Sequence, residues 1–105
     1  MTAHRLCAFD DLIDGGVRRF DVGGHAIAVV RVGDDVFALG DRCTHQDVSL
    51  SAGEVDEDEC TLECPKRGAA FRLDSGEPTC LPATQPVPVY EVAVVDGDVM
   101  VEVGR

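Results

Sequence analysis

The residues with the clearest chemistry are two short groups of cysteine and histidine in the middle of the chain. The first is Cys43-Thr44-His45, and the second begins at Cys64 and continues as Pro65-Lys66-Arg67-Gly68. Thiolates and imidazoles are good ligands for transition metals. Two short ligand loops separated by a hairpin can converge on one metal centre from opposite sides. We therefore expect a metal site that uses both groups.

The cysteine count favours metal binding over disulfide formation. There are five cysteines, and the N-terminal segment lacks the apolar core of a signal peptide. An odd count without a secretory signal argues against a disulfide framework, and we expect a cytoplasmic protein. Cys7 is expected in the core of a first strand. Cys60 is expected to be a small apolar strand residue, because an extended chain would place its Cα about 13 Å from that of Cys64.

The overall charge excludes several classes of partner. The formal net charge is −11 in 105 residues, which disfavours both the phosphate backbone of nucleic acids and anionic membrane surfaces. No stretch approaches the roughly 20 apolar residues that a membrane helix needs. A basic protein partner, found by electrostatic steering, fits this charge better. An acidic surface that only maintains solubility is the other interpretation.

Short strands joined by tight turns must position the ligand groups. Apolar runs separated by glycine and aspartate predict hairpins, and the expected strands are Val17–Val22, His25–Val32, Val36–Leu39, Val87–Val95 and Val99–Val103. Phe9–Ile13 is the one helix candidate, a single turn that Asp10 or Asp11 could cap and that would end at Gly15-Gly16. Pro86 and Pro88 predict that the strand near them begins at a sheet edge.

The segment from Gly40 to about Thr84 differs from this regular framework. It contains four of the five cysteines and has weak periodicity. An irregular segment that carries the soft ligands indicates a site set into a β scaffold. Within it, the acidic run Glu54–Glu59 has five acids in six positions; such a run is usually a solvated turn, but here it could help to dock a basic reductase.

Over essentially its whole length the chain resembles the Rieske-type ferredoxins. It is most similar to those linked in actinobacteria to aromatic-ring oxygenases or to the SUF cluster-assembly system. The resemblance is carried by Cys43-Thr44-His45-Gln46-Asp47, Ser49–Val55, Glu63–Lys66, Gly68–Phe71 and Leu81–Tyr90. It implies an all-β fold of stacked antiparallel sheets. It also implies one domain over 1–105, with a small cluster-binding subdomain at about 40–84 inserted in the β base.

The resemblance also implies a 2Fe–2S cluster and its ligands. In a Rieske centre two cysteines hold one iron and two histidines hold the other. Cys43 and Cys64 would hold the inner iron and His45 the outer iron. The family pattern has a second histidine where this chain has Arg67.

Arg67 leaves the fourth ligand open between several arrangements. Direct ligation would require iron to displace a proton from a guanidinium of very high pKa. A cationic Arg67 could instead donate to a cluster sulfide or to Cys64, with water, Lys66, Asp47 or a partner protein supplying the ligand. Cys80, in a segment that resembles a lid over the cluster, is a weaker candidate. In a third interpretation the cluster site has decayed and the fold survives as a docking module.

Two further departures place the chain at the low-potential end of the family. Respiratory Rieske proteins carry an extra cysteine in each ligand loop, and here the first loop continues as Gln46-Asp47-Val48. Those proteins also have serine and tyrosine hydroxyls beside the second loop, where this chain has Ala69 and Phe71. Fewer donors to the cluster sulfurs disfavour the added electron.

The function implied is one-electron transfer, without catalysis by the chain itself. The electron would arrive from a flavin-dependent ferredoxin reductase and leave to an oxygenase or to another iron–sulfur protein. Two alternatives belong to other classes of function. One is a labile cluster-binding module of iron–sulfur assembly or regulation, and the other is a cluster-free docking domain.

Overall fold

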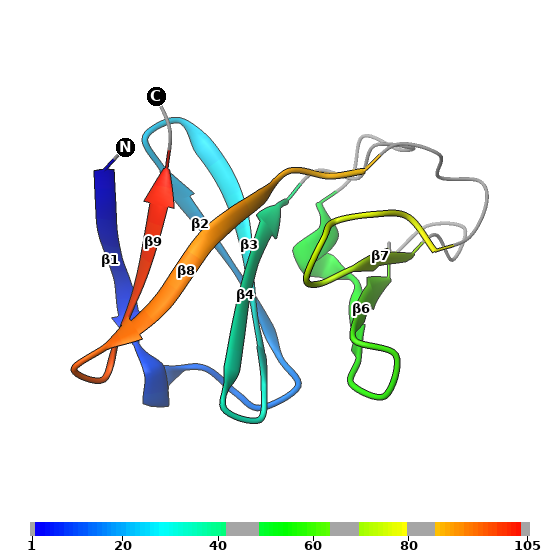
Figure 1. Cartoon of the computed structure of the whole chain (residues 1–105), viewed down its shortest axis with the longest axis horizontal. Helices are drawn as coiled ribbons and strands as arrows, with labels where there is room; N and C mark the ends of the chain where they lie inside the picture. The colour runs from blue at the N-terminus through cyan, green and yellow to red at the C-terminus, as the bar shows by residue number, and fades with distance from the viewer. Residues whose placement is uncertain (1, 42–48, 64–69, 80–85, 104–105) are drawn as a thin grey trace.

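The computed structural model describes residues 2–41, 49–63, 70–79 and 86–103. These residues form two antiparallel sheets (Figure 1). The order of the large sheet is β1 (Thr2–Ala8), β9 (Asp98–Val103), β8 (Val89–Val95), β4 (Asp35–Gly40), β3 (His25–Val32) and β2 (Val17–Val22). The small sheet contains β5 (Glu54–Asp56), β6 (Thr61–Glu63) and β7 (Ala70–Arg72). The all-β prediction is confirmed.

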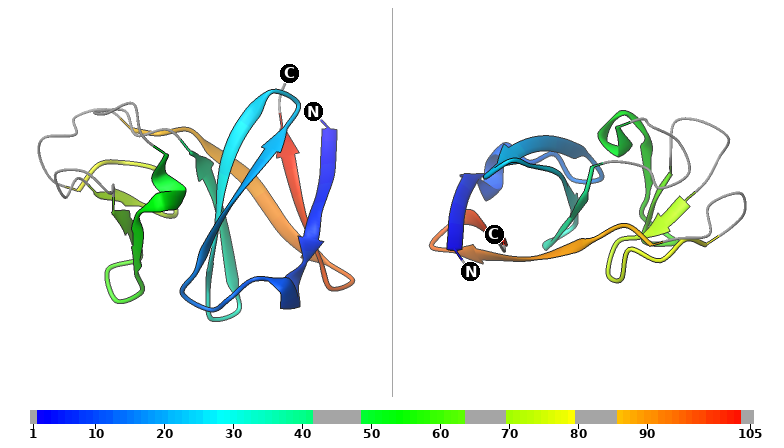
Figure 2. Two further views of the ribbon diagram at one scale, coloured as in Figure 1. Left: turned by 180° about the vertical axis from the view of Figure 1, so that it is seen from behind. Right: turned by 90° about the horizontal axis from the view of Figure 1, so that it is seen from above.

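The large sheet bends where β8 passes from one half to the other. β8 pairs with β9 over five registers but with β4 only at Ala38↔Tyr90 and Leu39↔Val89. The β1-β9-β8 half therefore lies over the β4-β3-β2 half, as the view from above shows (Figure 2). The small sheet lies beyond β4, on the side away from the two chain ends (Figure 1).

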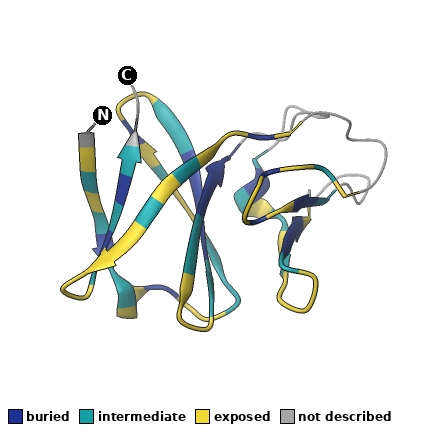
Figure 3. Ribbon diagram, in the orientation of Figure 1, coloured by how far each residue is buried: buried dark blue, intermediate teal, exposed yellow. Residues whose placement is uncertain are grey.

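The middle of the β2–β3–β4 layer is buried on both of its faces. In β3, Ile27 and Val29 point into one core while Ala28 and Val30 point into another, and none of the four is accessible to solvent. Alternate strand residues face opposite sides of a sheet. The first core is shared with β1 and β9, and the second with the small sheet. The buried positions follow this layering (Figure 3), which confirms the stacked-sheet prediction.

The predicted hairpins form, and their turns explain the glycines. Gly23 and Gly24 have φ of 56° and 85°, and Asp96 and Gly97 have φ of 52° and 80°. Two successive positive φ angles match the tight turns that suit the twist of a hairpin. The strands begin and end within two residues of the predicted limits. The hairpin assignments from sequence are therefore confirmed.

The predicted helical turn forms, but its predicted cap and end are wrong. It is a 3-10 segment, Phe9–Asp11, that follows Ala8 without a side-chain cap and ends well before Gly15. β8 begins after Pro88, and its first two residues, Val89 and Tyr90, pair with β4 but not with β9, which agrees with the prediction that this strand begins at a sheet edge. Pro88 contributes its carbonyl oxygen, which accepts a 2.8 Å hydrogen bond from the Gly40 N–H. Among the residues described, no helix is long and apolar enough to cross a membrane.

Candidate metal centre

The four predicted ligand positions, Cys43, His45, Cys64 and Arg67, lie outside the described residues. The same holds for the alternative donors Lys66, Asp47 and Cys80. The structure does describe the residues at both ends of each of the three segments that contain them. The contacts among these end residues define the framework on which a metal centre is built.

Asp41 and the residues from Ser49 to Ser51 border the first segment, residues 42–48. The Asp41 carboxylate accepts hydrogen bonds from the Ser49 hydroxyl and, at 2.8 Å, from the Ser51 N–H. The Asp41 carbonyl oxygen accepts a further bond from the Leu50 N–H. Asp41 is 3% exposed, so these bonds lie in the interior. The two ends of the first segment are thus joined through one buried side chain.

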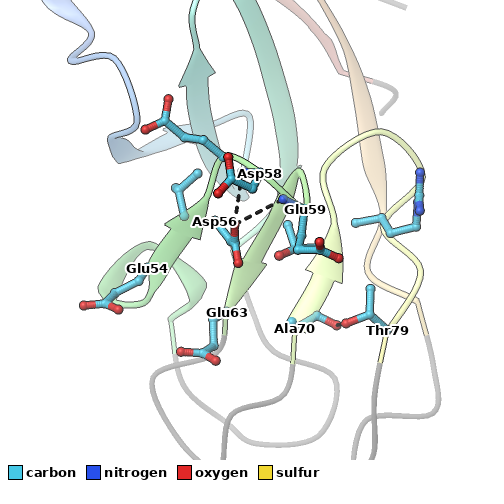
Figure 4. Close-up of a pocket in the computed structure, with 11 residues that line it drawn as sticks. Glu54, Asp56, Asp58, Glu59, Glu63, Ala70 and Thr79 are labelled. Carbon is cyan, nitrogen blue, oxygen red and sulfur yellow. Dashed lines mark hydrogen bonds between the residues drawn. The ribbon is translucent and has the colours of Figure 1, made fainter.

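Glu63 and Ala70 border the second segment, residues 64–69, and are cross-strand partners in β6 and β7. The Ala70 carbonyl oxygen accepts bonds from the Thr79 N–H at 2.8 Å and from its hydroxyl at 3.3 Å. Thr79 in turn borders the third segment, residues 80–85. Glu63, Ala70 and Thr79 therefore lie beside one another at one end of the small sheet (Figure 4).

Gly53 connects this group to the first segment. A Cβ atom at Gly53 would overlap the carbonyl oxygen of Glu63, so the backbone after the short 3-10 segment Leu50–Ala52 passes directly against the end of β6. Only glycine allows so close an approach. Asp41, Glu63, Ala70 and Thr79 are thus linked through a continuous set of contacts, and the three segments leave from one region of the molecule.

An acidic groove runs along the small sheet from this end to the turn at its opposite end. It has a volume of about 570 Å³, and Figure 4 shows the carboxylates around it. The residues that line it come from β5, the following turn, β6, β7 and Thr79; the acidic ones are Glu54, Asp56, Glu57, Asp58, Glu59 and Glu63. Asp56 accepts 3.1 Å bonds from the N–H groups of Asp58 and Glu59, which fix the turn. The acidic run thus lines a concave surface that extends from the turn after β5 to the borders of the ligand segments at Glu63, Ala70 and Thr79.

The two described cysteines each pack against one of the two cores. Cys7 is buried in β1 as predicted, and burial raises the pKa of its thiol. Cys60 packs against the second core but lies in a turn with a φ of 57°, so the prediction that it is a strand residue is wrong. Burial, followed by the charge of Asp74, raises the pKa of the Cys60 thiol. Within the described ranges, no group of three or more potential metal ligands is present.

Sequence reasoning missed the two residues that organise the framework. Asp41 was unremarkable at the end of a strand, although an aspartate two residues before Cys43, with Ser49 and Ser51 downstream, is a detectable pattern. Gly53 gave no signal of its own, because its contact with Glu63 depends on how β6 lies. His25 is half-buried and makes an edge contact with Tyr90 at 5.9 Å between ring centres.

The donor set fits a 2Fe–2S cluster at three of its four positions. Cys43 and Cys64 would supply the thiolates that such a cluster requires, and His45 would supply one imidazole. The guanidinium of Arg67 carries no free lone pair at neutral pH. Phe71 is completely buried in the core.

Comparison with known proteins assigns the family. The model of the Rieske [2Fe-2S] domain matches residues 2–91. Ferredoxin CarAc of Metapseudomonas resinovorans is 44% identical over 98 residues, which cover 92% of this chain and 90% of CarAc. The solved ferredoxin of carbazole 1,9a-dioxygenase from Nocardioides aromaticivorans IC177 superposes with a TM-score of 0.93 at 35% identity, covering 96% of this chain and 97% of that one.

A second similar structure is that of a complex. A chain in the complex of reduced oxygenase and oxidized ferredoxin in carbazole 1,9a-dioxygenase superposes with a TM-score of 0.87 at 42% identity, covering 94% of this chain and 91% of that chain. These relatives are ferredoxins, which carry electrons to an enzyme and are not themselves the enzyme. The chain therefore belongs to the Rieske [2Fe-2S] domain family and is a one-electron carrier of the Rieske ferredoxin class, with a 2Fe–2S cluster as its cofactor.

Proposed function

We propose that the cluster is bound by Cys43 and Cys64 on the inner iron and by His45 on the outer iron, with the Arg67 position at the fourth place. The cluster supplies a centre that is reduced and reoxidised by one electron. The observation that carries this proposal is the joining of the segment ends: Asp41 bonds to Ser51 at 2.8 Å, and Ala70 bonds to Thr79 at 2.8 Å. Ligands on these segments start from one framework.

Arg67 has one of two roles in this proposal. As a ligand, its guanidinium must release a proton to solvent when it binds iron, as thiols do when they bind a metal. As a cation it would donate to a sulfide or to Cys64, and water, Lys66, Asp47 or a partner would complete the outer iron. The variant Arg67→His distinguishes the proposal from two alternatives: a cluster site that has decayed, and a residue 67 that does not lie at the ligand position. It is expected to give the spectrum of an ordinary Rieske centre, and an unchanged spectrum would mean that residue 67 is not at the ligand position.

The decisive experiment for cluster binding is anaerobic purification with measurement of iron, sulfide and the EPR signal after reduction. A stable red-brown protein with a rhombic signal supports a robust carrier. Slow bleaching would instead favour the labile assembly module, for which the substitution at Arg67 is the motivating observation. A colourless protein without iron would leave only the cluster-free docking domain.

We further propose that a flavin-dependent reductase donates the electron and that a ring-hydroxylating oxygenase accepts it. Support for the acceptor comes from the similar chain in the oxygenase–ferredoxin complex. We expect the docking surfaces of these partners to be basic, because this chain has a net charge of −11 and an acidic groove that reaches the borders of the ligand segments. The rate of reduction by a purified reductase is expected to fall with ionic strength. A rate independent of salt would contradict electrostatic docking.

Two organisational points complete the proposal. Residues 1–105 form one Rieske domain, in which about 40–84 are the cluster-binding subdomain inserted in the β base. The small sheet and its borders fall within that span. A cytoplasmic location is in keeping with the free thiols of Cys7 and Cys60. Limited proteolysis tests the first point, since a single domain should not yield a stable fragment that ends near residue 40.

A further inference from the structure

Asp41 is the one charged residue among the described residues that is buried at the border of a ligand segment. Its side chain is 3% exposed, and a carboxylate is costly to bury unless its oxygens are satisfied. One oxygen, Oδ1, accepts from the Ser51 N–H at 2.8 Å, and the other, Oδ2, accepts from the Ser49 hydroxyl. The Ser49 and Ser51 hydroxyls are themselves 2.7 Å apart. The carboxylate is thus fully engaged by the far end of the first segment.

The backbone of Asp41 is fixed as well as its side chain. Its N–H donates a 3.0 Å bond to the Ala26 carbonyl oxygen in β3, and its own carbonyl oxygen accepts from Leu50. Both ends of residues 42–48 are therefore held to each other and to β3. Seven residues with closed ends have far fewer conformations than a free loop.

Arg19 on β2 adds a cation at the outer side of this group. Its Nε lies 3.6 Å from Asp41 Oδ2, while its other nitrogen bonds Asp21 at 3.2 Å. The Arg19 side chain is half exposed, so it balances the charge of Asp41 more than it fixes the loop. Ser49 and Ser51 therefore hold the ends of the loop together. Arg19 partly neutralises the negative charge of the buried Asp41 carboxylate.

We propose that Asp41 is a positioning residue for the cluster, which closes residues 42–48 and so sets the arrangement of Cys43 and His45. The inference rests on the proposed function, because it assumes that these two residues are ligands. Asp41 lies outside the ligand motif Cys43-Thr44-His45. Asp41 acts through the loop, and it touches neither iron nor sulfur in this proposal.

The test compares Asp41→Asn with a matched control, Asp98→Asn. Both changes remove one carboxylate paired with an arginine, since Asp98 lies 3.1 Å from Arg5, but Asp98 is on β9 in the part of the large sheet away from the small sheet. Asp41→Asn loses the acceptor of the Ser49 hydroxyl bond. Bleaching of the cluster in air should then be about tenfold faster, as expected for one lost bond to a charged group. Asp98→Asn should bleach at the wild-type rate.

Ser49→Ala keeps the test decisive if Asp41→Asn does not fold. It removes the hydroxyl donor without changing the net charge. The EPR line shape of the reduced cluster should broaden and bleaching should accelerate, while Ser49→Thr, which retains the hydroxyl, should restore both. Arg19→Gln should leave the line shape unchanged and lower the midpoint potential, because it exposes the cluster to more of the Asp41 charge.

The outcomes separate this inference from the proposed function. A wild-type protein that binds the cluster, with Ser49→Ala and Asp41→Asn variants that match it in line shape and bleaching, would overturn the positioning role alone. A wild-type protein without a cluster would overturn both. Equal losses in Asp98→Asn and Asp41→Asn would also overturn the inference, because the effect would then be general destabilisation.

Discussion

The large and small sheets are stabilised in different ways. Strands of the large sheet are six to eight residues long, are rich in valine and are joined by tight turns. Each strand of the small sheet has three residues, too few to be stable alone. The small sheet depends on Leu62 and Phe71, which are fully buried against the β3–β4 face, and on the contacts at Gly53 and Asp41. The large sheet is a scaffold of long paired strands, whereas the small sheet is held by its packing on that scaffold and by the contacts at the borders of the ligand segments.

The largest expected effect separates the site from the scaffold. Cys64→Ala should abolish cluster binding, because a thiolate of the inner iron is lost. The far-ultraviolet circular dichroism of the large sheet should be retained. Cys60→Ala is the matched control, since Cys60 lies four residues earlier and its thiol is free. Loss of iron in both variants would contradict the assignment of Cys60 as a packing residue.

Two leucine truncations probe the two cores. Leu62→Ala and Leu12→Ala each remove a buried side chain and should lower the free energy of unfolding by about 2–5 kcal/mol. Leu62 belongs to the core under the small sheet and Leu12 to the core between the halves of the large sheet. Only Leu62→Ala should also speed the loss of iron. Equal iron loss in both would show that the two regions are not separable.

Two glycine substitutions sharpen the comparison at smaller cost. Gly53→Ala forces a Cβ into the Glu63 carbonyl oxygen and should cost about 1–3 kcal/mol, with reduced iron content. Gly24→Ala has open space but a φ of 85°, so its cost of about 1–2 kcal/mol is backbone strain alone. Thermal unfolding and iron analysis should show that the melting temperature and the iron content are both lowered in Gly53→Ala. In Gly24→Ala only the melting temperature should fall.

The smallest effect concerns a pair of acids on the large sheet. A hydrogen bond with Glu91, its cross-strand partner, raises the pKa of Glu102. The folded state therefore binds this proton more tightly than the unfolded state, and the stability it contributes is lost as the pH rises through the folded pKa.

Glu102→Gln should consequently flatten the dependence of melting temperature on pH between mildly acidic and neutral solution. Glu59→Gln, a change of the same charge in the acidic run, should retain the slope of the wild-type protein. Iron content should be unaffected in both variants. A Glu102→Gln curve parallel to the wild-type curve would argue against proton sharing between Glu91 and Glu102.

The difference between the regions also explains what sequence alone predicted. Hairpins follow from local turn chemistry, so Gly23-Gly24 and Asp96-Gly97 were sufficient to place β2–β3 and β8–β9. Cys60 was predicted to be a strand residue, and its turn was missed because its positive φ comes from the hairpin between β5 and β6. The hydrogen bond that the Pro88 carbonyl oxygen accepts from Gly40 could not be predicted, because it requires a strand distant in sequence.

The candidate site divides in the same manner. The ligand types and their spacing were visible as Cys43, His45 and Cys64, and the missing histidine as Arg67. The framework that joins the loop ends was not, since it brings Asp41 to Ser51 and Gly53 to Glu63 through tertiary packing. Motifs identify which residues bind a metal, whereas long-range contacts decide how they are held.

EPR spectroscopy of the reduced protein, with iron and sulfide analysis, tests the central claim most directly when wild type and Arg67→His are compared. The account predicts a 2Fe–2S cluster in both, with a wild-type signal that differs from that of an ordinary Rieske centre. The Arg67→His signal should match such a centre. Identical signals in the two proteins would contradict the placement of residue 67 at the fourth ligand position. A wild-type protein without iron would contradict the cluster assignment itself.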